Sequence, residues 1–207
     1  MDEKKNSTIC EEQIIKLNYL MMPTVNFDKV IIPESCEKLI TSWRIGCDIS
    51  NKLEKLLGTT KCLIIDATAN IGGLTIPLSK KFQYVAAYEI EKSYCEILEK
   101  NINLYNINNV TIINEDFTSI IKFCTKPKAI IIDPPWYNTD GSFNQNMKLS
   151  GVNISLLIKY LFLITDSIIL IKVPINYLNS ELNYSFTYNY KKMKFLVFMK
   201  YHYLRCN

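Results

Sequence analysis

The chain has 207 residues, 48% of them hydrophobic and 21% charged, which is typical of one soluble globular domain. Its only histidine, His202, cannot by itself build a histidine-based catalytic triad or a histidine metal cluster, so both are excluded. The net charge is only +4, with the basic excess in the C-terminal half, and no segment has the roughly 20 uninterrupted apolar residues of a membrane span.

Cysteine usage gives an expectation about the compartment. The seven cysteines are scattered without a C-x-x-C pair, and the chain opens without a signal peptide. Thiols stay reduced in intracellular compartments. We therefore expect a nuclear or cytoplasmic protein in a reducing environment.

The first 58 residues are expected to be helical. Apolar residues at helix-like spacing predict three helices, at about residues 11–20, 33–43 and 48–57. Gly58 follows the third helix, where a C-cap glycine is common. We therefore assign residues 1–58 to an N-terminal helical extension and residues 59–207 to the main domain.

From residue 61 short apolar runs alternate with helical periodicity. The predicted strands are 62–66, 84–88, 110–114, 129–133 and 167–173, followed by a closing hairpin of 184–190 and 194–203. The predicted helices are 73–81, 91–105, 118–124, 153–165 and a short one from Pro174. Strands separated by helices favour a mainly parallel sheet with helices on both faces, an α/β fold with an antiparallel C-terminal edge.

The first four predicted strands each end at or near an acidic residue. These residues are Asp66, Glu89, Asp116 and Asp133. The carboxyl ends of parallel strands share one rim, where open α/β sheets bind ligands. Helix capping explains any one such acid, but four together indicate a common crevice.

A turn with two glycines, Gly72 and Gly73, follows Asp66. Glycines permit a tight turn and close approach of the backbone to a ligand. NAD would need the fuller G-x-G-x-x-G turn, whereas S-adenosylmethionine has no pyrophosphate and suits this looser one. The residues expected to bind it in this segment are Asp66, Thr68, Ala69, Asn70 and Gly72.

Residues after the next two strands suit a nucleoside. We expect Glu89 to accept hydrogen bonds from ribose hydroxyls and Asp116 to accept one from the adenine amino group. Phe117 would flank the adenine.

The apolar run 129–132 ends in Asp133, two prolines and Trp136. Prolines cannot continue a strand ladder or a helix, so the chain leaves the sheet with a stiff backbone. The Asp133 carboxylate beside the Pro134 carbonyl makes a hydrogen-bond acceptor, and the indole offers a stacking surface. This corner suits a planar heterocycle with an amino group. The alternative is a proline-rich turn plugged by a buried tryptophan.

Together these motifs resemble class I S-adenosylmethionine-dependent methyltransferases, Rossmann-like enzymes that methylate exocyclic amino nitrogens. Residues 72–76 and 134–136, with a helical extension in front, are similar to the trimethylguanosine synthase family, which methylates N2 of the 7-methylguanosine RNA cap. The resemblance spans about residues 28–173. That family usually has Ser before the prolines, where this chain has Asp133, and glycines after the tryptophan, so adenine-N6 and other guanine-N2 methyltransferases stay open.

The resemblance implies catalytic roles for Asp133, Pro134 and Trp136, with capped RNA as partner and with neither membrane nor metal. Stacking on Trp136 would favour a cationic 7-methylguanine. Tyr137 or Phe143 would cover the other face of the base, and Lys148 would meet the triphosphate; loop packing is the alternative for all three.

Other readings also stay open. The runner-up substrate is adenine N6 in RNA or DNA, and a different class of function is a catalytically silent subunit that only binds nucleic acid or a partner enzyme. Basic and aromatic residues gather near the C-terminus, namely Lys191, Lys192, Lys194, Lys200, Arg205, Tyr188, Tyr190, Tyr201 and Tyr203. They would either follow a phosphate backbone or protect the edge of the sheet.

Overall fold

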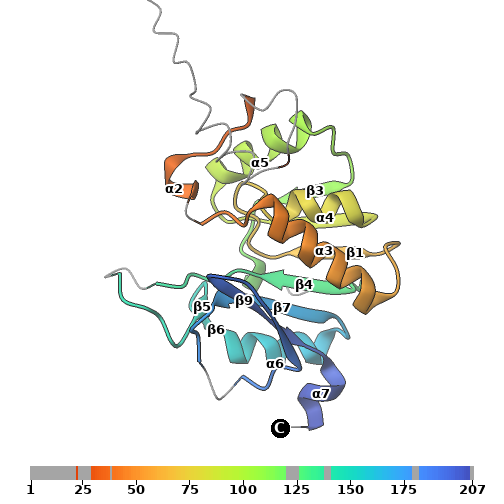
Figure 1. Cartoon of the computed structure of the whole chain (residues 1–207), viewed down its shortest axis with the longest axis vertical. Coiled ribbons are helices and arrows are strands. Elements are labelled where there is room, and N and C mark those ends of the chain that lie inside the picture. Colours follow the sequence, from red (N-terminus) through yellow and green to blue (C-terminus); the bar gives the residue numbers. More distant parts are fainter. Residues whose placement is uncertain are drawn as a thin grey trace, which may run out of the picture.

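The computed structural model describes residues 22, 29–37, 39–119, 126–137, 141–178 and 182–205, without the side chains of 203–205. In these residues a seven-stranded sheet has the order β3-β2-β1-β4-β7-β9-β8 (Figure 1). Its first five strands are parallel and the last two antiparallel. No helix in these segments is both long and apolar enough to cross a membrane.

The elements follow the predicted alternation closely. The sheet strands are β1 Leu63–Asp66, β2 Tyr84–Tyr88, β3 Val110–Ile113, β4 Ala129–Ile132, β7 Ile168–Pro174, β8 Phe186–Asn189 and β9 Met193–Phe198. The helices are α2 Glu34–Glu37, α3 Trp43–Leu57, α4 Thr75–Lys81, α5 Lys92–Leu104, α6 Ile154–Ile164 and α7 Lys200–Arg205. In Figure 1 α2 and α5 lie at the β3 end of the molecule and α7 at the opposite end.

Successive residues of the central strands enter different cores. Ile64 and Ile131 pack with α3 and α4 on one face of the sheet. Ile65 and Ile130 pack with α6 on the other face. All four residues of β4 are buried, as expected for a parallel strand covered on both sides. This double burial explains why the strands appear as continuous apolar runs in the sequence.

The helix α3 is one 15-residue helix that begins at Trp43, so the predicted boundary at residue 48 is wrong. Gly58 ends it with φ 66°, as predicted, and donates its N–H to the Glu54 carbonyl at 2.8 Å. The predicted helix 33–43 is reduced to the four residues of α2. Residues 39–42 instead pass over Gly73, a tertiary contact that outweighs their local helical preference.

Several C-terminal predictions are also corrected. β7 continues to Pro174 and a turn follows, so there is no helix at 174–178. Residues 200–203 belong to α7 rather than to the last strand. The loop after Trp136 contains a small hairpin, β5 Lys148–Leu149 and β6 Val152–Asn153.

Two predicted helices lie wholly or partly outside the described residues. The helix at 11–20 is one of them. Of the helix at 118–124, the described part is only a 3-10 turn, η2 Phe117–Ser119.

The described part of the N-terminal extension shares the core of the main domain. Ile49 and Leu53 of α3 are fully buried among residues of β1, β4 and α4. α3 is thus an integral layer of the fold. The domain boundary at residue 58 stays a prediction.

Gly73→Ala should lower the free energy of unfolding by about 2 kcal/mol, since overpacking a close contact costs roughly this much. The added methyl group would lie 2.6 Å from Ile40 Cγ1 and 2.9 Å from the Thr41 carbonyl oxygen. Gly58→Ala is the control, because at φ +66° with no atom within 4 Å only backbone strain of about 1 kcal/mol is expected. Urea unfolding measures both variants, and equal losses would contradict crowding at Gly73.

Candidate active site

The ends of β1 and β4 lie side by side in the middle of the sheet. The chain first builds β2 and β3 on one side of β1, then returns to place β4 and β7 on the other side. The strand order therefore reverses between β1 and β4. Ligands of open α/β sheets bind outside the carboxyl ends of the strands at such a reversal.

The turn after β1 is fastened to both neighbouring strands. Toward β2, the Ala69 N–H donates to a strand carbonyl at 2.8 Å and the Asn70 N–H donates to Glu89 Oε2 at 2.7 Å. Toward β4, the Thr68 hydroxyl accepts a 2.8 Å hydrogen bond from the backbone N–H of Asp133. The predicted cofactor-binding turn and the predicted catalytic corner are thus in direct contact.

Asp66 is the most buried of the predicted acids, with 1% of its surface exposed. Burial is the main cause that raises its pKa to about 6. Its carboxylate accepts hydrogen bonds from the Thr75 hydroxyl at 2.7 Å and the Thr68 N–H at 3.4 Å, and both lower the pKa. Asp66 therefore braces the turn from within, and its expected contact with the cofactor stays a prediction.

Two of the other predicted acids act on Asp66 at this rim. The charges of Asp133 and Glu89 each raise the pKa of Asp66, in addition to the larger effect of burial. Glu89 is 8% exposed, and its oxygens accept from the N–H groups of Asn70 and Glu91 at 2.7 and 2.9 Å. A carboxylate offers about four acceptor positions, so Glu89 keeps capacity for ribose hydroxyls.

The residues predicted to meet the adenine have protein partners of their own. The Asp116 carboxylate accepts hydrogen bonds from the N–H and the hydroxyl of Thr118, both at 2.8 Å. Partial burial acts to raise the pKa of Asp116, but these bonds and one from Ser150 lower it. Phe117 is 2% exposed and packs edge-to-face on Tyr88 at 5.4 Å. It is mostly buried in the core, and its expected place beside the adenine stays a prediction.

The two glycines of the turn are crowded by the protein itself. Gly72 has φ 107°, and a Cβ there would lie 2.8 Å from Leu98 Cδ1. At Gly73 the close neighbours are Ile40 and Thr41. The glycines therefore allow packing of the turn against α5 and the N-terminal segment, and the expected approach of a ligand to Gly72 stays a prediction.

The corner after β4 has a partner that the sequence reasoning missed, Lys172 of β7. The Lys172 ammonium lies 2.5 Å from Asp133 Oδ2 and 5.1 Å from the centroid of the Trp136 ring. The indole N–H donates to the Lys172 carbonyl at 3.3 Å. Burial raises the pKa of Asp133, while Lys172 and the indole oppose this shift. Among described residues nothing donates to the buried Pro134 carbonyl, so it is available as an acceptor.

Aromatic side chains gather next to this corner. Tyr137 is 57% exposed and its ring centroid lies 6.1 Å from that of Phe143, which lies 6.3 Å from that of Tyr177. The loop after β4 thus carries all three aromatic residues that were predicted to bind the substrate, Trp136, Tyr137 and Phe143. Tyr177, which was not predicted, packs against Phe143. Lys148 is exposed on β5, and the described structure records no contact between it and this group.

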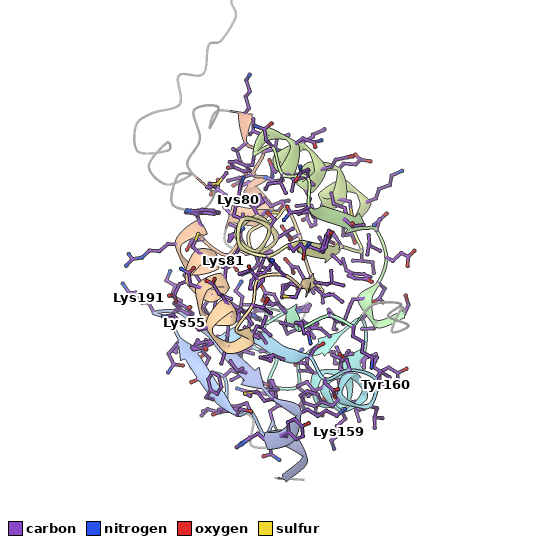
Figure 2. The ribbon with its side chains drawn as sticks, turned by 90° about the vertical axis from the view of Figure 1, so that its right-hand side faces the viewer. Lys55, Lys80, Lys81, Lys159, Tyr160 and Lys191 are labelled. Atoms are coloured by element: carbon purple, nitrogen blue, oxygen red, sulfur yellow. The ribbon has the colours of Figure 1, made fainter. Side chains whose placement is uncertain are left out.

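The basic residues near the C-terminus do not form one surface. Lys194 donates to the Tyr177 carbonyl and Lys200 pairs with Asp166. Lys191 lies at the turn between β8 and β9, at the same rim as the end of β7 because Pro174 pairs with Met193. Lys80 and Lys81, labelled in Figure 2, lie in the last turn of α4.

Two tyrosines of this region, Tyr188 and Tyr190, pack against α3. Lys52 lies over the rings of Tyr188 and Tyr190, at 4.7 and 4.9 Å from their centroids. The Tyr190 hydroxyl donates to Asp48 at 2.6 Å. These two rings are thus engaged within the protein.

A family model described as RNA cap guanine-N2 methyltransferase matches residues 61–201. The chain belongs to this family. Membership confirms the resemblance drawn from the motifs, and S-adenosylmethionine is accordingly the cofactor.

Two relatives illustrate the range of similarity. An uncharacterized protein of Acanthamoeba polyphaga mimivirus is 27% identical over 157 residues, 73% of this chain and 58% of that protein. An uncharacterized RNA methyltransferase of Prochlorococcus marinus is 30% identical over 124 residues, 59% of this chain and 27% of that protein. The chain thus spans well under two thirds of the length of these relatives.

Solved structures confirm the predicted Rossmann-like class I fold. A hypothetical protein of Thermus thermophilus superposes with TM-score 0.63 at 11% identity, covering 82% of this chain and 92% of that chain. A SAM-dependent methyltransferase of Neisseria gonorrhoeae has TM-score 0.54 at 16% identity, with 79% and 75% covered.

The residues at the rim fit the family's cofactor. S-adenosylmethionine carries a positive sulfonium and an ammonium group, and the Glu89 carboxylate lies against the turn, where it accepts from the Asn70 N–H. Glu89 also retains acceptor positions for a ribose. An acidic acceptor at this place suits a cationic nucleoside.

Asp66→Asn should flatten the pH dependence of stability between about pH 4 and 6. The folded pKa of about 6 exceeds the ordinary 3.8, so the native state holds this proton more tightly than the unfolded state. The contribution of Asp66 is then fully present below about pH 4 and lost as the pH rises through 6, about 3 kcal/mol in total. Asparagine still accepts from the Thr75 hydroxyl.

Urea unfolding of wild type and Asp66→Asn at pH 4.5 and pH 8 measures this effect. Asp166→Asn is the control, because the carboxylate is 81% exposed and paired with Lys200 at the surface. The control should keep the wild-type loss of stability toward pH 8. If Asp66→Asn loses as much stability toward pH 8 as wild type does, the charge of Asp66 is not unfavourable in the folded state.

Proposed function

We propose that this chain transfers a methyl group from S-adenosylmethionine to an exocyclic amino nitrogen of a base in RNA, with N2 of the 7-methylguanosine cap as the favoured target. The observation that carries this proposal is the hydrogen bond between the Asp133 N–H and the Thr68 hydroxyl, which joins the acceptor corner to the cofactor turn. Family membership supports the guanine-N2 assignment.

The corner has the groups that this chemistry needs. The lone pair of an exocyclic amino nitrogen is delocalised into the ring, which makes it a poor nucleophile. Two N–H groups held by the Asp133 carboxylate and the Pro134 carbonyl would favour a pyramidal nitrogen whose lone pair points at the methyl group. The donor is already activated, so positioning contributes most of the rate. The base has to be single-stranded or flipped out to reach this corner.

Aromatic contacts support a cationic base. Lys172 lies over one face of Trp136, so an incoming base would stack on the opposite face. Cation–π attraction to an indole is worth about 0.5–2 kcal/mol and would favour 7-methylguanine over guanine. Tyr137, which is exposed next to this corner, would cover the other side of the base. Nothing beyond its charge supports the proposed triphosphate contact of Lys148.

One feature favours the second candidate, adenine N6 in RNA or DNA. The acid at the corner, Asp133, stands where the cap family usually has serine, and a carboxylate accepts an adenine amino group equally well. A catalytically silent role is the third candidate. The retained carboxylate and cofactor turn speak against it.

A substrate panel separates these candidates. The full chain is incubated with methyl-labelled S-adenosylmethionine and capped RNA, the same RNA without the cap, or DNA of the same sequence, and the product nucleosides are identified. We expect label in 2-methylated 7-methylguanosine from capped RNA only. Label in N6-methyladenosine would establish the second candidate. Cofactor binding without transfer to any substrate would support the silent role.

Asp133→Asn should reduce methyl transfer at least 100-fold while changing the affinity for S-adenosylmethionine less than about threefold, because the amide offers one acceptor oxygen and an opposing donor. Turnover and calorimetric cofactor binding measure the two effects. Asp166→Asn, at an exposed surface pair, should leave both unchanged. Wild-type turnover in Asp133→Asn would remove Asp133 from the mechanism.

Trp136→Ala should weaken binding of 7-methylguanosine nucleotides by roughly tenfold, and of unmethylated guanosine nucleotides by less, because only the methylated base gains a cation–π contribution. Fluorescence titration with both nucleotides measures the ratio. Tyr84→Ala removes an exposed aromatic at the opposite end of β2 and should change neither affinity. Equal losses for the two nucleotides would argue against a cap substrate.

A further inference from the structure

Lys172 is a buried cation at the back of the acceptor corner. Only 2% of its surface is exposed, and its neighbours along β7 are apolar. Its ammonium contacts two segments: in the corner after β4, Asp133 Oδ2 at 2.5 Å and the face of the Trp136 ring at 5.1 Å, and in the N-terminal segment the Leu39 carbonyl at 3.5 Å. Each of the three ammonium hydrogens can thus point at an acceptor or at a π surface.

Sheet stability alone does not account for a lysine at this position. Desolvating two charges often costs more than their attraction returns, and apolar replacements of buried ion pairs are frequently neutral or stabilising. The rest of β7 is filled by Ile, Leu and Val side chains. A retained ion pair directly behind the acceptor group therefore calls for a functional explanation.

We propose that Lys172 is a positioning residue of the methyl-acceptor site, holding one oxygen of Asp133 and the ring of Trp136 in place so that the carboxylate and the indole meet the substrate base together. This inference rests on the proposed function. It adds that binding of the base depends on the state of Asp133: the amino group is bound only when the Asp133 carboxyl group is ionised and correctly oriented. Lys172 supplies both conditions without touching the substrate.

The charges around Asp133 support this dependence. Lys172 faces it from β7, and Asp66 acts on the same site from β1 with the opposite sign. The turn contributes the neutral Thr68 hydroxyl, and the N-terminal segment contributes the neutral Leu39 carbonyl. Burial raises the pKa of Asp133, and Lys172 is the largest opposing influence. Without Lys172 the carboxyl group would be protonated over more of the working pH range.

Lys172→Met tests the inference through the pH profile of methyl transfer. At neutral pH kcat should fall roughly tenfold, and the acid limb should move upward by about one pH unit or more, since a paired cation lowers a carboxyl pKa by about 1–3 units. Activity should recover as the pH is raised, which a merely structural defect would not produce. Lys172→Arg keeps the charge and should retain the wild-type limb.

The control is Lys194→Met on the adjacent strand β9, a part-buried lysine that donates to the Tyr177 carbonyl. It should leave the acid limb in place. An unshifted limb in Lys172→Met, or an equal shift in Lys194→Met, would overturn the inference.

A second measurement needs no substrate and separates failure of this inference from failure of the proposed function. In Lys172→Met the unpaired Asp133 should have a folded pKa above its unfolded value, so stability should be lost as the pH rises through it. The double variant Asp133→Asn, Lys172→Met should keep only the loss that Asp66 causes. If wild type methylates nothing, the proposed function fails, yet this comparison still decides the pairing. Identical pH curves for the two variants would overturn the inference.

Discussion

The hydrogen bond from the Asp133 backbone to the Thr68 hydroxyl couples the two loops on which the candidate site depends. β1 and β4 are hydrogen-bonded neighbours although about 60 residues of chain separate them, because the β2–β3 half of the sheet is built in between. Their two end loops therefore meet at one point of the rim. If the first loop holds the methyl donor and the second holds the amino group, as proposed, the pairing of β1 with β4 brings the two together.

Much of this arrangement could be predicted because its signals are local. β4 is buried on both faces and so appears as an unbroken apolar run, and the prolines after it mark where the chain leaves the sheet. The acids at the strand ends are predictable for the same reason, because each lies at or near the end of an apolar run in the sequence. Whether such an acid faces a ligand or the interior is not local, because Asp66 is turned inward by Thr75 from the next helix.

The partner of Asp133 could not be derived from the sequence for a similar reason. Lys172 is 39 residues away, and its contact depends on β7 pairing with β4. The sequence signal for this partner was only that Lys172 interrupts an apolar strand. That signal indicated that the run does not span a membrane, and not which residue Lys172 contacts. Likewise, the start of α3 is set by residues 39–42 passing over Gly73, a contact that helical periodicity does not encode.

The same N-terminal segment has a consequence for what counts as the smallest working unit. The family match begins at residue 61, yet the Leu39 carbonyl reaches Lys172, Ile40 rests on Gly73, and α3 fills one face of the core. A chain trimmed to residues 61–201 would expose the apolar surface that α3 covers. It would also remove the N-terminal contacts to Lys172 and Gly73. Residues before the matched region are therefore part of the unit that supports the site. Transferring the motif alone to another scaffold would lose these supporting contacts.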